Sequence, residues 1–159
     1  MPRNRKYYKR KFGELTNTYY HHLDLRPYSD LDDEGFAYII EHVKRIDMLD
    51  LHETDVTDKS IKLLPALEYV KELRLKDCYL ITDDCVSDLN RIKGLTFLYL
   101  KGTSITSHGL LNLTGQPFLK ELHFSDAGDN INLPTTMLRL KQQMPECTIV
   151  INSKDYQFP

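Results

Sequence analysis

Apolar and polar residues follow one another in a frame that recurs about every 25 residues along the chain. Each unit opens with the arrangement apolar-x-x-apolar-x-apolar, and its last two apolar residues alternate with polar ones. Such alternation predicts a short strand with one buried face. The units that align in this frame are YHHLDLRPYSDLDDEGF from Tyr20, IDMLDLHETDVTDKSI from Ile46, VKELRLKDCYLITDDCV from Val70, LTFLYLKGTSITSHGL from Leu95 and LKELHFSDAG from Leu119.

The middle apolar position of every unit is a leucine, and successive leucines are 26, 24, 25 and 24 residues apart. These residues are Leu23, Leu49, Leu73, Leu98 and Leu122. The next apolar position is occupied by Leu25, Leu51, Leu75, Leu100 and Phe124. Because a nearly constant step places equivalent residues on neighbouring turns, we expect the strands to lie side by side and in register.

Polar residues typical of a helix N-terminus follow each of the first four predicted strands. Their side-chain oxygens can accept hydrogen bonds from the first N–H groups of a helix, and early acids complement its dipole. The candidate starts are Leu31-Asp32-Asp33, Val56-Thr57-Asp58, Ile81-Thr82-Asp83 and Ile105-Thr106-Ser107. Apolar residues at helical spacing come next, for example Val86, Leu89 and Ile92. Each unit is therefore predicted to be a strand, a turn and a helix.

The two ends of the chain depart from the repeat. Residues 1–19 are basic and rich in aromatic side chains, and they are predicted to form a cap or to remain partly disordered. After Phe124 the pattern loosens through SDAGDNINLP, and LPTTMLRLKQQMP then predicts a helix that ends at Pro145. A further strand is expected at about residues 148–151. The domain boundaries that follow are 1–19 for the N-terminal segment, 20–151 for about five repeats with a capping strand, and 152–159 for a loose tail.

The motif LxxLxLxxCxxITDxxL resembles the leucine-rich repeats of the cysteine-containing, ribonuclease-inhibitor-like type. The residues that carry the resemblance are Leu73, Leu75, Cys78, Ile81, Thr82, Asp83 and Val86. The resemblance implies an α/β solenoid with parallel strands on the concave face and helices on the convex face. The cysteine column contains Thr54, Cys78, Thr103 and Ala127, so one unit alone keeps the thiol. We interpret this column as small side chains that turn inward and bond neighbouring turns.

A second resemblance covers a shorter part of the chain. Residues 67–95, LEYVKELRLKDCYLITDDCVSDLNRIKGL, are similar to a segment of the mitochondrial ATP synthase coupling factor B and the related distal membrane-arm assembly proteins. The alternative function implied is that of an assembly or coupling factor on the matrix side of mitochondria. The basic start is rich in Tyr and Lys rather than Ser and Ala, which is atypical of a matrix-targeting peptide.

Composition restricts the classes of protein that remain. With 159 residues, 41% hydrophobic and 28% charged, the chain fits one globular domain. No apolar run is long enough to predict a membrane span. Three cysteines, Cys78, Cys85 and Cys147, lack metal-site spacing and indicate free thiols in a reducing compartment, so we expect a cytoplasmic protein. We also expect a monomer.

The outward positions of the predicted strands form columns across one face, and this face is the expected binding surface for a protein partner. The candidate partner-binding residues are Met48, Asp50, Arg74, Lys76, Phe97, Tyr99, Lys101 and His123. Phe97 and Tyr99 stand out because large aromatics beside an arginine are typical of binding hot spots. The alternative is that neighbours, or the N-terminal segment, cover these two rings.

Metal-binding, reactive-thiol and catalytic sites have weaker support in the sequence. His22, Asp24, Asp50 and His52 have the chemistry of metal ligands on adjacent strands, although opposite charges on a solvated face explain them too, and we expect neither a metal nor a cofactor. Cys85 lies at a predicted helix start, but adjacent acids oppose thiolate formation. No motif places a base beside a nucleophile, so we expect no enzyme.

The first 11 residues hold six cations and no acid, whereas the other 148 residues carry about -8. RNRKYYKRKF interleaves cations with aromatics, as nucleic-acid-binding segments do. Contact with an acidic partner, or with the chain's own acidic stretch DLDDE, explains the same residues. Nucleic-acid binding is therefore a second alternative to protein binding.

Overall fold

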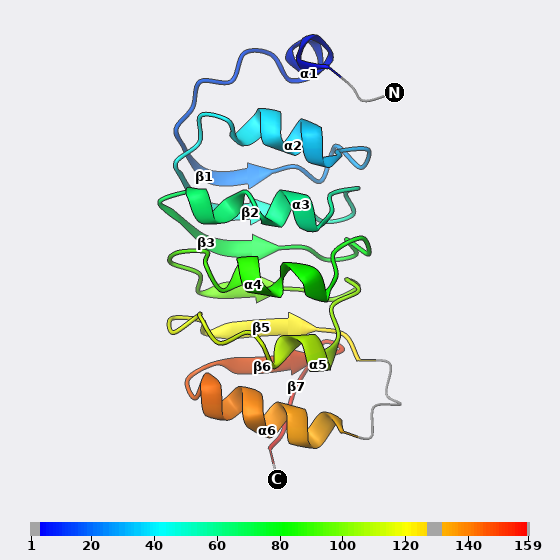
Figure 1. The fold of residues 1–159 in the computed structure, drawn as a ribbon, viewed down its shortest axis with the longest axis vertical. Helices are drawn as coiled ribbons and strands as arrows, with labels where there is room; N and C mark the ends of the chain where they lie inside the picture. The colour runs from blue at the N-terminus through cyan, green and yellow to red at the C-terminus, as the bar shows by residue number, and fades with distance from the viewer. Residues whose placement is uncertain (1–3, 127–131, 159) are drawn as a thin grey trace.

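The structure is a computed structural model, and it describes residues 4–126 and 132–158. A single sheet of seven strands runs through the described residues in the order β1-β2-β3-β4-β5-β6-β7, which is also the chain order. Figure 1 shows the strands stacked from the N-terminal to the C-terminal end, with a row of helices beside them. The protein is thus α/β, with an open sheet whose first six strands are parallel.

The elements alternate between strand and helix along most of the chain. The strands are β1 (Tyr19–Asp24), β2 (Arg45–Asp50), β3 (Tyr69–Arg74), β4 (Phe97–Tyr99), β5 (Glu121–Phe124), β6 (Thr148–Ile151) and β7 (Lys154–Asp155). The α-helices are α1 (Arg5–Phe12), α2 (Asp33–Ile40), α3 (Asp58–Ile61), α4 (Val86–Leu89), α5 (Ser107–Leu110) and α6 (Leu133–Gln143). Two 3₁₀ turns, η1 (Leu64–Ala66) and η2 (Asp83–Cys85), complete the third and fourth helical segments.

The leucine column is in register across the sheet, as the spacing predicts. Leu23 pairs with Leu49, Leu49 with Leu73, Leu73 with Leu98 and Leu98 with Leu122. Ile149 of β6 continues the column beyond Leu122. All six side chains are buried in one core together with the apolar faces of α2 to α6. Burial of each leucine contributes about 1.5–3 kcal/mol, so the repeat stabilises the fold in equal steps.

A sharp turn leads from each strand to the next helix. The backbone is left-handed at Glu53 and Asp77, with φ of 57° at both, and Gly102 takes the equivalent position with φ of 77°. The residue after each of these points inward. Thr54 Oγ1 donates to the carbonyl of Leu51 at 2.8 Å, and Thr103 Oγ1 donates to that of Leu100 at 2.8 Å.

Cys78 occupies the same inward position and joins two turns. Its Sγ lies 2.9 Å from the Leu51 carbonyl oxygen of the preceding turn and 3.8 Å from Thr54 Oγ1. The thiol is fully buried. The prediction that this column bonds neighbouring turns is therefore confirmed at Cys78. Ala127, the last member predicted for the column, lies outside the described residues.

The predicted helix starts are N-caps. The side chains of Asp32, Thr57, Thr82 and Thr106 each accept a hydrogen bond from an N–H group of the first helical turn. At three of these helix starts, the aspartate that follows the N-cap accepts hydrogen bonds from the N-cap threonine of the next repeat. The capping pattern alone does not predict this contact. Each carboxylate accepts from a threonine amide at 2.7–2.8 Å and from the same threonine's hydroxyl at 2.6–2.7 Å. The pairs are Asp33 with Thr57, Asp58 with Thr82 and Asp83 with Thr106.

The N-terminal segment forms a cap, which was one of the two predicted outcomes. Helix α1 begins after the N-cap Asn4, and its Tyr8 is buried against α2. The Tyr8 hydroxyl donates to Asp32 Oδ1 at 2.9 Å. The Phe12 ring meets the Tyr28 ring edge to face, with the centroids 5.0 Å apart. The first repeat is thus covered on the side that has no preceding repeat.

The C-terminal end closes the stack with more structure than the sequence predicts. The strand expected at 148–151 is present as β6, parallel to β5. The prediction of a loose tail is wrong for Lys154–Asp155, because these residues form β7 and pair antiparallel with β6. Among the residues described, none of the helices combines the length and apolar character needed to cross a membrane.

Candidate functional site

The face of the sheet opposite the helices, here called the open face, carries three rows of outward side chains. Strand pairing aligns the first row and the second row across β1 to β5. The first row is His22, Met48, Glu72, Phe97 and Glu121. The second row is Asp24, Asp50, Arg74, Tyr99 and His123. The third row follows directly after the strands and consists of Arg26, His52, Lys76, Lys101 and Ser125.

Aromatic rings pack together in the middle of the open face. The rings of Tyr99 and His123 stack with centroids 4.6 Å apart, and Phe97 stacks with Tyr99 at 6.2 Å. The His52 ring also contacts Tyr99, with the ring centroids 5.7 Å apart. Phe97 and Tyr99 are half-buried rather than fully exposed. The interplanar angles are 20° for Phe97–Tyr99 and 25° for Tyr99–His123, so the three rings form one continuous aromatic surface. We call Phe97, Tyr99 and His123 the aromatic plate.

Arg74 extends the aromatic plate on the β3 side. Its guanidinium lies over the Phe97 ring, 5.1 Å from the centroid, and its Nη2 donates to Glu72 at 2.9 Å. The Arg74 Nε is buried and has no hydrogen-bond partner among the residues that the structure describes. Met48 is half-buried on the neighbouring strand, in register with Glu72. Arginine, aromatic and methionine side chains therefore adjoin one another, a composition that is enriched in the core of protein interfaces.

The β1–β2 end of the open face is occupied by ion pairs. The Arg26 side chain donates two hydrogen bonds to Asp24, from Nε to Oδ1 at 2.9 Å and from Nη2 to Oδ2 at 2.7 Å. These bonds lower the pKa of Asp24 to about 2. Arg26 Nε also lies 3.5 Å from Asp50 Oδ2, and Asp50 is only 2% exposed. Asp50 is thus on the predicted face, but its carboxylate is largely hidden from a partner.

His52 lies between the ion pairs and the aromatic plate. Burial lowers its pKa, an effect that the nearby Asp50 opposes and that Lys76, Arg26 and Arg74 reinforce. His52 Nδ1 is 3.5 Å from Asp50 Oδ1, and its Nε2 is buried without a hydrogen-bond partner in residues 4–126 and 132–158.

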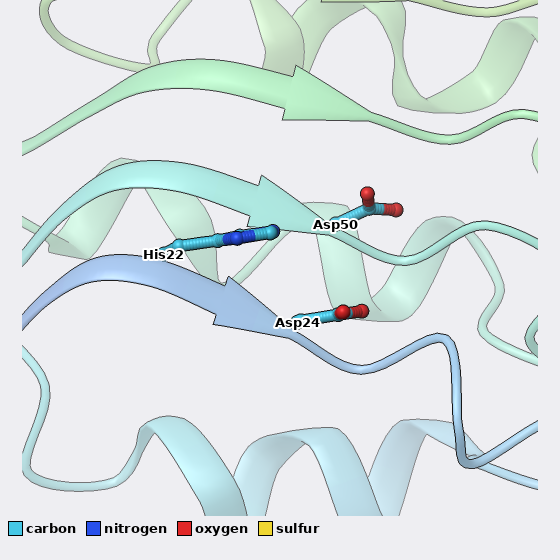
Figure 2. Close-up of side chains that lie close together, drawn as sticks. All are labelled: His22, Asp24 and Asp50. Atoms are coloured by element: carbon cyan, nitrogen blue, oxygen red, sulfur yellow. The ribbon is translucent and has the colours of Figure 1, made fainter.

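Three of the four residues with metal-ligand chemistry do come together. One ligand atom each from His22, Asp24 and Asp50 lies within 4.8 Å of the other two. Figure 2 shows His22 and Asp24 on β1 beside Asp50 on β2. The Arg26 guanidinium already bonds Asp24 and lies beside Asp50, so a metal ion would have to compete with it for both carboxylates. The geometry fits a charge-paired group of the folded protein better than a metal centre.

The two lysines of the third row have weaker partners than the other charges of the open face. Lys101 Nζ bonds the Ser153 hydroxyl at 2.8 Å, and among the described residues no carboxylate lies within ion-pair distance of it. Lys76 Nζ is 3.3 Å from the exposed carboxylate of Asp77. Both lysines are half-buried and follow strands that flank or contain the aromatic plate. Cationic charge is therefore available beside Tyr99.

The cysteines do not form a reactive site. Burial raises the pKa of Cys78, and it raises that of Cys147 to about 11. Cys85 is fully buried, and both burial and the neighbouring Asp58 raise its pKa strongly. A thiol at this helix start therefore favours the protonated form, and the cause is burial together with Asp58 rather than the acids adjacent in sequence. The three cysteines are free.

Structure brings most of the predicted partner-binding residues into one group, and it adds others. Arg74, Phe97, Tyr99 and His123 are in direct contact, while Lys76 and Lys101 lie next to them in the third row. The sequence did not predict that His52 contacts Tyr99 or that Arg26 pairs with Asp24. Their column positions were visible in the sequence, but the side-chain directions that join them were not.

Comparison with known proteins adds no identity to this description. Neither the models of protein families nor the curated proteins yield a match to the chain. Function must therefore be inferred from the residues themselves.

Proposed function

We propose that the chain is a small leucine-rich repeat solenoid that binds a protein partner on its concave, open face and performs no catalysis. The proposal is supported by the in-register leucine column and by helices that share one core with it. The observation that carries the binding function is the aromatic plate with Arg74 over Phe97, at the middle of a face that the helices leave open.

The alternative that the N-terminal segment covers the plate has no support. Helix α1 packs on α2, and its described contacts reach Asp30, Asp32 and Glu41, all of them at the first repeat. Figure 1 likewise shows α1 at the end of the stack, beyond α2.

Nucleic-acid binding through the basic segment has less support than protein binding. Arg5 pairs with Glu41 at 2.7 Å, Lys11 with Asp30 at 2.7 Å, and Lys9 with Glu14. Three of the five basic residues of this segment that the structure describes are therefore engaged with acids of the same chain. Contact with phosphates would require these pairs to exchange partners.

Affinity capture from the native host tests the proposal. We expect wild-type protein to retain a partner that the Phe97→Ala/Tyr99→Ala variant loses. The matched control is Tyr79→Ala/Phe118→Ala, which removes two rings that are 64% and 69% exposed and lie outside the three rows. Equal capture by the wild type and the Phe97→Ala/Tyr99→Ala variant would contradict binding on this face.

We further propose that the protein acts as a monomer in a reducing compartment, the cytoplasm. Three buried free thiols support this compartment, since none is placed to form a disulfide in the fold.

A further inference from the structure

Charge on the open face changes along the strand direction. The first row carries Glu72 and Glu121 and no lysine or arginine, whereas the third row carries Arg26, Lys76 and Lys101 and no acid. The first row thus contributes two acids and the third row three cations, while the second row between them carries both signs, in Asp24, Asp50 and Arg74.

Most of these charges are already neutralised within the chain. Glu72 is paired with Arg74 at 2.9 Å, and Glu121 contacts His123. Arg26 is held by Asp24 and Asp50 at the far end of the face. The exceptions are Lys76, whose partner is an exposed aspartate, and Lys101, whose partner is a serine hydroxyl. A partly exposed ion pair such as Lys76–Asp77 contributes little, so Lys76 loses little when it exchanges Asp77 for another carboxylate.

The two lysines are neighbours in space. The amide of Asp77 donates to the carbonyl of Lys101 at 2.8 Å, so the chain at Lys76 and Lys101 runs on adjacent strands. Adjacent strands are about 4.8 Å apart, and Lys101 follows Tyr99 by two residues, which is about 6.6 Å along a strand. A cationic pair and an apolar plate are thus within the reach of one short peptide.

We propose that the open face recognises an acidic segment of a partner protein, in which a carboxylate side chain binds Lys76 and Lys101 while an apolar or aromatic side chain lies on Phe97 and Tyr99. This inference rests on the proposed function and names the chemistry of the partner. An extended segment rises about 3.3 Å per residue, so the acid and the apolar anchor are about two residues apart.

A nucleic acid fits this face less well. Aromatic rings and lysines could stack bases and contact phosphates. However, a continuous phosphate backbone would also pass the carboxylates of Glu72 and Glu121, and Glu121 has a histidine rather than a lysine or arginine as its partner. A peptide with one or two discrete acids can place them over the third row alone.

Hollows elsewhere on the described surface are less informative. One is lined by Arg5, Tyr8, Glu34 and Tyr38 among others, beside α1, and its one arginine is already paired with Glu41. Another, of about 450 Å³, lies at the β1–β2 end of the third row and is lined by Arg26, His52, Glu53 and Lys76 among others. This second hollow borders the proposed lysine site, but the acids Asp24 and Glu53 line it as well, so it adds no argument for an acidic ligand.

Selection from a library of random dodecapeptides on the immobilised full chain tests the proposal. We expect enriched peptides to share Asp or Glu about two residues from Leu, Phe, Tyr or Trp. A synthetic copy of the most enriched peptide should lose about tenfold in affinity with Lys76→Ala/Lys101→Ala. Arg at both positions should restore binding, and Lys59→Ala/Lys62→Ala, which removes two exposed lysines of the helical side, should leave it unchanged.

The outcomes separate the two proposals. Acidic recognition would be overturned if the enriched peptides lacked an acid, or if Lys76→Ala/Lys101→Ala kept an affinity within twofold of wild type. In that case, loss of binding in Phe97→Ala/Tyr99→Ala would still support the open face as a binding surface. If neither double variant weakens binding, both proposals fail. A selection that yields no binder overturns acidic recognition, as does a single-stranded oligonucleotide that displaces the peptide and depends on the same two lysines.

Discussion

The two sides of the same strands differ in how strictly they repeat. On the buried side, β2, β3 and β4 place Leu49, Leu73 and Leu98 in register, each with 0% exposure. On the open face, the residues that directly follow these leucines are Asp50, Arg74 and Tyr99. Stacking requires the same shape at every step, whereas recognition requires a particular chemistry at one place. The regular side therefore sets stability, and the irregular side is where we expect binding.

The largest effect should come from breaking the buried column. Leu73→Ala removes a side chain that is enclosed by Leu49 and Leu98 on both neighbouring strands. We expect it to lower the free energy of unfolding by about 2–5 kcal/mol, because the cavity can collapse only partly. Urea unfolding followed by circular dichroism measures this loss. A loss below that of the surface change Lys71→Ala would contradict the role of the column.

The second largest effect should come from the acid ladder, the name used here for the hydrogen bonds of Asp33, Asp58 and Asp83 to the threonine of the next helix start. Asp58 accepts hydrogen bonds from the amide and hydroxyl of Thr82, so Asp58→Ala leaves two donors to find other partners. We expect a loss of about 2–3 kcal/mol in the same unfolding experiment. Asp55→Ala is the matched control, since Asp55 is exposed and follows the turn of the same unit. Equal losses for the two variants would mean that the ladder contributes nothing beyond an ordinary surface acid.

Acid should weaken the same ladder. Burial alone would raise the pKa of Asp33, but hydrogen bonds from Ser60 and Thr57 outweigh it, and the folded-state pKa lies below the usual 3.8. A depressed folded pKa stabilises the fold above the unfolded-state pKa, and this stability is lost as pH falls through the folded pKa. Wild-type protein should therefore lose stability more steeply below about pH 4 than Asp33→Asn does. Thermal melts at a series of pH values test this, with the exposed Asp84→Asn as control.

The smallest effect on stability should come from the open face. Phe97→Ala/Tyr99→Ala removes two half-buried rings that stack with each other and with His123. We expect about 1–2 kcal/mol for the two changes together, less than the single buried leucine. Differential scanning calorimetry provides the comparison. A loss as large as that of Leu73→Ala would show that the plate belongs to the core rather than to a binding surface.

Sequence predicted the strands and helix starts well because each depends on local patterning. Leucine spacing was sufficient to predict which residues pair, and Thr57 and Thr82 were recognisable as N-caps. Contacts that depend on side-chain direction were not predictable in this way. Three features of the open face each depend on one rotamer among several: the hydrogen bonds from Arg26 to Asp24, the burial of Asp50, and the contact of His52 with Tyr99.

The tail illustrates the same limit at the level of the backbone. Nothing in SKDYQFP shows the alternation of a strand, yet Lys154–Asp155 pairs with β6. Left-handed backbone at Asn152 and Ser153, with φ of 50° and 67°, reverses the chain there. Edge pairing of this length depends on the neighbouring strand being available, which short-range pattern does not encode.

The most direct test of the account is the footprint of a captured partner on the isotope-labelled full chain. Nuclear magnetic resonance would compare side-chain signals with and without the partner. We predict shifts at Arg74, Phe97, Tyr99 and Lys101, with the helical side unchanged. Shifts confined to α2, α3 and α4 would contradict the claim that the irregular face of the strands is the one that binds.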